Sequence, residues 1–175
     1  SLHRMEIKPD AGALVEQQAV AILPNDTAYA VFRKLTCAAE QLLLRCLPLL
    51  LQGRVQETAL DLSTGSYFGG RRPEDGRIDW HKTAVAIHNL IRAVAPPYPG
   101  AFFIIKGFRL QVLGSYYRDR PAAGKAPRIY WHDGRCHADC IDGRQLELTT
   151  LAIEGEPLDE AGFRARFGAV ELDLT

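Results

Sequence analysis

The residues that could do chemistry lie in two short loops. In the first, Asp10 stands two residues before Gly12 in the run KPDAG, so a carboxylate occupies a tight turn where the backbone can approach a ligand. An aspartate in such a turn more often bonds its own backbone. In the second, Arg71 and Arg72 follow two glycines, and guanidinium groups bind phosphate oxygens in bidentate fashion. Surface arginines are as often solvated charges, so both readings stay open.

A further pair of polar residues belongs to a predicted helix. Asn89 and Arg92 are three residues apart, a spacing that can place both on one helical face. They are as consistent with a hydrogen bond between structural units as with a ligand contact. A metal site is not expected, because Cys136 and Cys140 on one strand would lie about 13 Å apart.

The stretch from Tyr67 to Phe103 connects the arginine loop to this helix. Asp79 occupies the position of an N-cap, which predicts a helix that begins at Trp80. Apolar residues recur along it at helical spacing, and prolines end it: Trp80, Ala84, Ile87, Ile91 and Val94, followed by Pro96, Pro97 and Pro99. The pattern predicts a helix with one buried face.

The rest of the chain predicts a second helix and many short strands. Residues 1–5 and 15–23 are predicted strands, and Asn25 or Asp26 can cap a long helix that starts near Thr27 and ends before Gly53. Two strands and one helix bury little core alone, so residues 1–55 are interpreted as the end of an α/β domain. After Phe103, runs of alternating apolar and polar residues are separated by turns such as Asp133-Gly134. This pattern predicts a small antiparallel barrel.

Composition narrows the possible partners. Lys+Arg and Asp+Glu number 21 each, and from Trp80 onward they number 12 and 11, which argues against nucleic acid as a partner. The four Cys show no disulfide pattern, which indicates reduced thiols and a cytoplasmic protein. The most apolar run, residues 42–51, is about half the length of a membrane span, so no membrane association is expected.

Two sequence runs carry a resemblance to a known family. RRPEDGRIDWHK and HNLIRAVAPPYPGAF resemble sugar-nucleotide N-formyltransferases, especially those of the UDP-4-amino-4-deoxy-L-arabinose formyltransferase type that serve lipid A modification. The resemblance to methionyl-tRNA formyltransferase is more distant. The resemblance to the sugar-nucleotide N-formyltransferases covers most of this chain but only the C-terminal part of those enzymes. It implies formyl transfer from the cosubstrate 10-formyltetrahydrofolate to the amino group of a nucleotide-linked amino sugar.

The resemblance also implies roles for individual residues. HRM followed by KPDAGALV is similar to the family motif whose Asp completes an Asn/His/Asp active site, which implies that Asp10 orients the catalytic His and raises its pKa. By the same match, Glu6, Ile7, Lys8 and Pro9 contact the folate. Arg71 or Arg72 would bind the diphosphate of the substrate, with Asn89 and Arg92 as further contacts. The family's catalytic Asn and His are not among these 175 residues, so the chain alone is expected to be inactive.

These arguments predict an α+β chain in three parts. Residues 1–55 would end a Rossmann-like α/β formyltransferase domain, 56–79 would form a linker and substrate loop, and 80–175 would hold a helix and an OB-like antiparallel β-barrel. A homo-oligomer is possible. Two other functions stay open: methionyl-tRNA formyltransferase, which should carry a basic C-terminal unit, and a non-catalytic binding or oligomerisation module that uses the barrel face.

Overall fold

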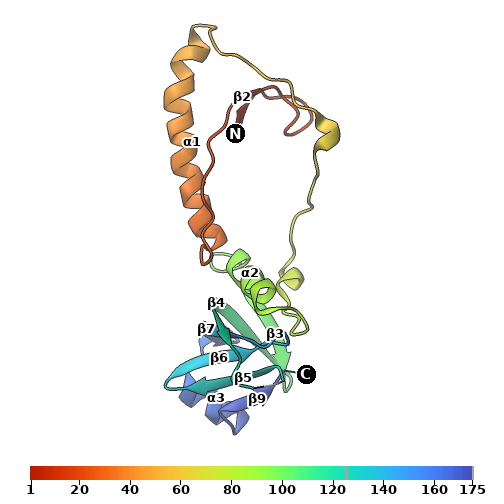
Figure 1. Cartoon of the computed structure of the whole chain (residues 1–175), viewed down its shortest axis with the longest axis vertical. Helices are drawn as coiled ribbons and strands as arrows, with labels where there is room; N and C mark the ends of the chain where they lie inside the picture. Colours follow the sequence, from red (N-terminus) through yellow and green to blue (C-terminus); the bar gives the residue numbers. More distant parts are fainter. Residues whose placement is uncertain (125, 175) are drawn as a thin grey trace. The chain divides into compact units, whose positions relative to one another are not determined.

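The computed structural model describes residues 1–124 and 126–174, which divide into two compact units. The first comprises residues 1–22 and 30–70, and the second comprises residues 23–29 and 71–175. Helices and a curled antiparallel sheet confirm the predicted α+β class (Figure 1). Within the described ranges, no helix is both long enough and apolar enough to cross a bilayer.

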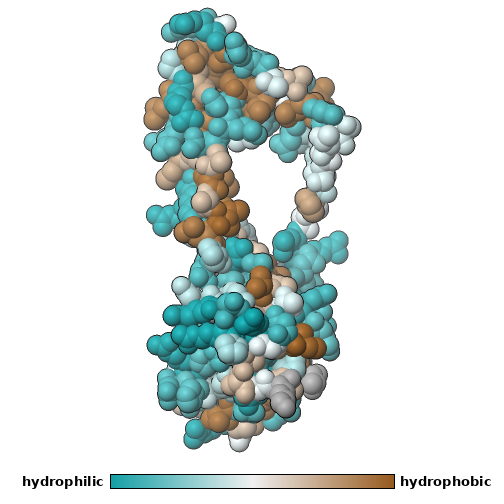
Figure 2. All heavy atoms as spheres, viewed as in Figure 1, coloured by the Kyte–Doolittle hydropathy of each residue, from teal (hydrophilic) through white to brown (hydrophobic). Residues whose placement is uncertain are grey.

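The first unit holds a small hairpin and most of a long helix. Strand β1 (Leu2–His3) pairs antiparallel with β2 (Leu14–Glu16), and a short 3-10 helix, η1, spans Leu62–Thr64. The predicted long helix is present as α1 (Ala28–Leu51). The predicted second strand is much shorter than expected, because residues 17–23 form no regular structure. Hydrophobic side chains of α1 reach the surface (Figure 2), among them Phe32, Leu35, Leu43, Leu44 and Leu47.

The second unit is built on a seven-stranded antiparallel sheet. Its strands are β3 (Ala101–Ile105), β4 (Phe108–Pro121), β5 (Arg128–His132), β6 (Arg135–Asp139), β7 (Arg144–Ile153), β8 (Glu156–Pro157) and β9 (Glu171–Asp173). The order is β3-β4-β7-β6-β5-β9, with β8 beside β7. The predicted turn at Asp133-Gly134 joins β5 to β6, with φ angles of 49° and 69° that suit these two residues.

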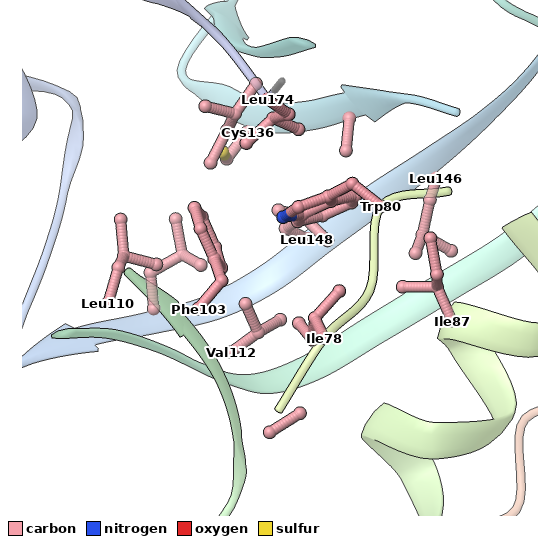
Figure 3. Close-up of a cluster of buried hydrophobic side chains, with 14 of the residues drawn as sticks. Ile78, Trp80, Ile87, Phe103, Leu110, Val112, Cys136, Leu146, Leu148 and Leu174 are labelled. Atoms are coloured by element: carbon pink, nitrogen blue, oxygen red, sulfur yellow. The ribbon is translucent and has the colours of Figure 1, made fainter. Parts of the chain in front are cut away.

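One face of this sheet and two helices enclose the core. Helix α3 (Glu160–Phe167) begins after Asp159, whose carboxylate accepts a hydrogen bond from Gly162 N at 2.8 Å. Alternate strand residues such as Leu110, Val112, Leu146 and Leu148 point into the cluster drawn in Figure 3. Trp80 packs edge-on against Phe103, with ring centroids 5.1 Å apart.

Helix α2 (Ala84–Ala93) starts later than the sequence predicted. Thr83 is its N-cap and accepts a hydrogen bond from Ala86 N at 3.2 Å. Asp79 instead accepts from His81 N at 3.0 Å within a turn. The prediction was wrong because Ile78 N donates to Phe102 O of β3 at 2.7 Å. This hydrogen bond keeps the chain at Ile78 extended along β3, and buried Trp80 follows before the helix begins. The predicted apolar face and the end before the prolines are confirmed.

Two side chains of helix α2 bond residues 24–26 within the second unit. Buried His88 donates from Nε2 to Pro24 O at 3.0 Å, so its Nδ1 accepts from the Ser115 hydroxyl at 2.8 Å in the neutral ring. Arg92 Nη1 donates to Asp26 O at 2.9 Å. Each ring nitrogen of His88 therefore has a partner that suits its neutral form.

Acidification should lower the free energy of unfolding through His88. Burial lowers the pKa of His88 in the folded chain. Because the unfolded ring has a pKa of about 6.5, stability is full above that pH and is lost as the pH falls from there through the folded pKa. Urea unfolding at about pH 7.5 and about pH 5 should show a smaller pH-dependent loss in His88→Gln than in the parent chain. Equal losses would contradict this role.

Candidate functional site

The loop that contains Asp10 is the tip of the β1–β2 hairpin. Arg4 N donates to Ala13 O at 2.9 Å across the hairpin. A Cβ on Gly12 would lie 1.9 Å from Arg4 O, so only glycine permits this approach of the two chains. Asp10 itself has φ of 57°, in the left-handed region that Asp tolerates better than most residues. The close approach of Gly12 to Arg4 O therefore allows the two strands of the hairpin to pair, which explains the glycine without a ligand.

The Asp10 carboxylate is exposed and faces a histidine. Its side chain is 80% accessible, and Oδ1 lies 3.6 Å from His3 Nε2. His3 Nδ1 lies 2.9 Å from Arg4 O and therefore donates to it, which leaves Nε2 toward the carboxylate. The two groups form an ion pair when the ring is protonated at both nitrogens. His3 was not predicted as a site residue. The sequence signal that could have identified it is its place on strand β1 of the hairpin whose loop contains Asp10.

The other residues of the predicted folate loop are exposed as well. Glu6, Ile7, Lys8 and Pro9 all lie on the surface of the first unit. The Tyr67 hydroxyl donates to Pro9 O at 3.1 Å, and Lys8 Nζ lies 5.4 Å from the centre of the Tyr67 ring. Tyr67 therefore braces the loop, a contact between residues 58 positions apart that local patterns could not reveal.

Arg71 and Arg72 line a pocket of about 440 Å³ in the second unit. A short 3-10 helix, η2 (Pro73–Gly76), follows them, and Asp75 accepts a hydrogen bond from Arg72 N at 2.8 Å. The remaining walls are mainly apolar or backbone: Ala28, Pro73, Gly76, Ala93, Val94, Tyr98, Pro99 and Gly100. Two guanidinium groups at a pocket with an aromatic ring can bind a phosphorylated ligand.

Asn89 and Arg92 contact each other on α2. Arg92 Nε donates to Asn89 Oδ1 at 2.8 Å, while its Nη1 holds Asp26 O. Both partners of this bond to Asp26 lie in the second unit, so it is not a hydrogen bond between structural units. Contact of either side chain with a ligand stays a prediction, and neither residue lines the arginine pocket.

The cysteines and histidines near residue 136 do not gather around a common point. Within residues 1–124 and 126–174, no three His, Cys, Asp or Glu side chains form a group suited to a metal ion. Cys136 and Cys140 are buried. Burial raises the pKa of the Cys140 thiol to about 12, which makes it a poor metal ligand or nucleophile at neutral pH.

The fold is similar to solved formyltransferases and to HypX. The N-formyltransferase from Helicobacter canadensis, in complex with folinic acid and dTDP-3-aminofucose, has a TM-score of 0.69 at 19% identity over 84% of this chain and 53% of its own. HypX from Aquifex aeolicus, in complex with tetrahydrofolic acid, has 0.67 at 15% over 94% and 29%. Methionyl-tRNA formyltransferase from Clostridium thermocellum has 0.50 at 17% over 86% and 53%.

The family follows from the sequence match. The chain spans about half the length of the sugar N-formyltransferase that it resembles. Residues 71–162, which are more than half of the chain and include Arg71, Arg72, helix α2 and strands β3 to β8, match the family described as formyl transferase, C-terminal domain. The chain therefore belongs to the formyl transferase C-terminal domain family.

Proposed function

We propose that this chain is the C-terminal part of an enzyme that transfers a formyl group from 10-formyltetrahydrofolate to a nucleotide-linked amino sugar. The observation that carries the proposal is the pocket with Arg71 and Arg72, inside a domain of the formyltransferase family. A nucleotide diphosphate supplies the oxygens that paired guanidinium groups bind. The finer proposal is UDP-4-amino-4-deoxy-L-arabinose as the substrate.

Asp10 would assist the proton transfers of this reaction by orienting a catalytic imidazole. The sugar amine attacks the formyl carbon, a C–N bond forms, and the carbonyl oxygen becomes an oxyanion. The amine then loses a proton, and collapse of the intermediate breaks the bond to N10 of the folate, which takes up a proton. An exposed carboxylate at a hairpin tip can orient an imidazole and favour its protonated form. That imidazole and the oxyanion-stabilising amide would come from residues outside this chain.

The hairpin loop would also face the folate. Glu6, Ile7, Lys8 and Pro9 offer exposed charged and apolar groups, and Tyr67 limits the motion of their backbone through Pro9. Folinic acid and tetrahydrofolic acid are bound by two of the similar structures. We propose 10-formyltetrahydrofolate as the donor on this basis.

Replacing either arginine with alanine should weaken substrate binding. We expect Arg71→Ala or Arg72→Ala in the full-length enzyme to raise KM for the nucleotide sugar by roughly 10- to 100-fold with little change in kcat, because a charged hydrogen bond contributes about 1.5–3 kcal/mol. Steady-state assays with UDP- and dTDP-linked amino sugars measure this. Arg109→Ala is the matched control, since Arg109 stacks on Phe102 away from the pocket. Unchanged KM in both pocket variants would return the arginines to solvated loop charges.

A direct comparison of acceptors tests the proposed function itself. The full-length enzyme should formylate an amino-sugar nucleotide and leave methionyl-tRNA unmodified, because the second unit has no basic excess. Salt-sensitive binding of tRNA with formylation of its methionine would favour the tRNA enzyme. Absence of turnover with every amino-sugar nucleotide would favour a non-catalytic module.

A further inference from the structure

The loop that carries Asp10 is closed at its neck. Arg4 N donates to Ala13 O at 2.9 Å, so residues 5–12 form the loop between them. The Arg4 guanidinium donates from Nε to Glu57 Oε1 at 2.8 Å, which joins the neck to a segment 53 residues further along the chain. Both segments belong to the first unit. The neck is therefore fixed by a side-chain contact from outside the hairpin.

The same later segment reaches the tip of the loop through Tyr67. Its hydroxyl donates to Pro9 O at 3.1 Å, and Lys8 Nζ lies 5.4 Å from the centre of its ring. Tyr67 is 64% exposed, so these two contacts rather than burial hold its side chain against the loop. Residues 57–67 therefore form a strap that is bonded to the neck at one end and to the tip at the other.

The bond to Pro9 acts directly on the backbone of Asp10. The Pro9 carbonyl belongs to the planar peptide group that ends at the Asp10 Cα, so a bond that fixes its oxygen fixes the whole group. Asp10 has φ of 57°, in the left-handed region that is unfavourable for a residue with a Cβ. Such a conformation persists where surrounding contacts hold it. The Tyr67 hydroxyl supplies one of these contacts, one residue away from the carboxylate.

We propose that Tyr67 is a positioning residue that aims the Asp10 carboxylate. The inference rests on the proposed function, in which that carboxylate orients a catalytic imidazole. Catalysis requires groups that are held close to the productive geometry, and a carboxylate on an untethered loop tip spends only part of its time there. Tyr67 therefore contributes to the rate of formyl transfer through Asp10, and its contribution disappears when the carboxylate is removed.

The kinetics of Tyr67→Phe in the full-length enzyme test this role. The substitution removes the hydroxyl and keeps the ring beside Lys8. We expect kcat to fall by about three- to tenfold, the range for one lost hydrogen bond, with KM for the nucleotide sugar unchanged within about twofold. In the Asp10→Asn background, the same substitution should lower kcat by less than about twofold.

Tyr116→Phe is the matched control for loss of a tyrosine hydroxyl. Tyr116 is an exposed tyrosine on β4 of the second unit, and it contacts Arg118 through its ring. We expect its variant to keep kcat within about twofold of the parent enzyme. Backbone NMR relaxation of this chain measures the strap without turnover. The order parameters of residues 6–12 should fall from about 0.85 in the parent to about 0.6 in Tyr67→Phe.

The outcomes separate this role from the proposed function. A parent enzyme that formylates no amino-sugar nucleotide contradicts the proposed function and this role with it. Turnover by the parent enzyme with an unchanged kcat in Tyr67→Phe overturns the role of Tyr67 alone, and so does an equal loss of kcat with and without the Asp10 carboxylate. Unchanged order parameters of the loop also overturn it. A loss of kcat confined to enzymes that retain Asp10, together with a more mobile loop, supports it.

Discussion

Asp10→Asn in the full-length enzyme should lower kcat of formyl transfer by about 10⁴-fold, the size of effect seen when a carboxylate that orients a catalytic histidine is neutralised. The substitution is nearly isosteric, and Asn tolerates the left-handed backbone found at this position. The side chain is 80% accessible, so the free energy of unfolding should change little.

Single-turnover assays of formyl transfer measure this effect, with circular dichroism and thermal unfolding as checks on the fold. Asp61→Asn is a matched control, because Asp61 is an exposed aspartate of the same unit that only caps η1 through Ser63. It should retain nearly full activity. A rate near that of the parent enzyme for Asp10→Asn would refute the assignment of the carboxylate.

Asp139→Ala should lower the free energy of unfolding of the second unit by about 3–5 kcal/mol. The carboxylate is fully buried, and its removal leaves the N–H groups of Ala123 and Gly124 and the Tyr130 hydroxyl without an acceptor. The substitution also removes one of the two carboxylates that form ion pairs with Arg128.

Urea unfolding followed by tyrosine and tryptophan fluorescence should show this loss as a lower midpoint with an unchanged m value. The control is Glu171→Gln, which removes the half-exposed partner on the other side of Arg128 and should cost less than about 1 kcal/mol. A loss below about 1 kcal/mol for Asp139→Ala would show that water or a shifted side chain replaces the carboxylate.

The elements that were predicted well are those with local causes. The turn at Asp133-Gly134 needs positive φ at two consecutive residues, and Asp-Gly meets that need by its own chemistry. The buried face of α2 follows from apolar residues at helical spacing, and its end follows from prolines that cannot continue a helix. Strands β5 and β7 follow from alternation between turns. The sequence by itself therefore determined the antiparallel domain and the two loops that could do chemistry.

Only the tertiary structure decided which of these groups meet. Asp79 and Thr83 are both competent N-caps, and the hydrogen bond from Ile78 N to β3 selected the second. His3 faces Asp10 across a hairpin, and Tyr67 reaches Pro9 from a distant segment. Asp139 is completely buried, and its carboxylate is satisfied by donors 15 and 11 residues away in the sequence. Propensities act over a few residues, whereas these contacts depend on hydrogen bonds and burial between segments that only folding brings together.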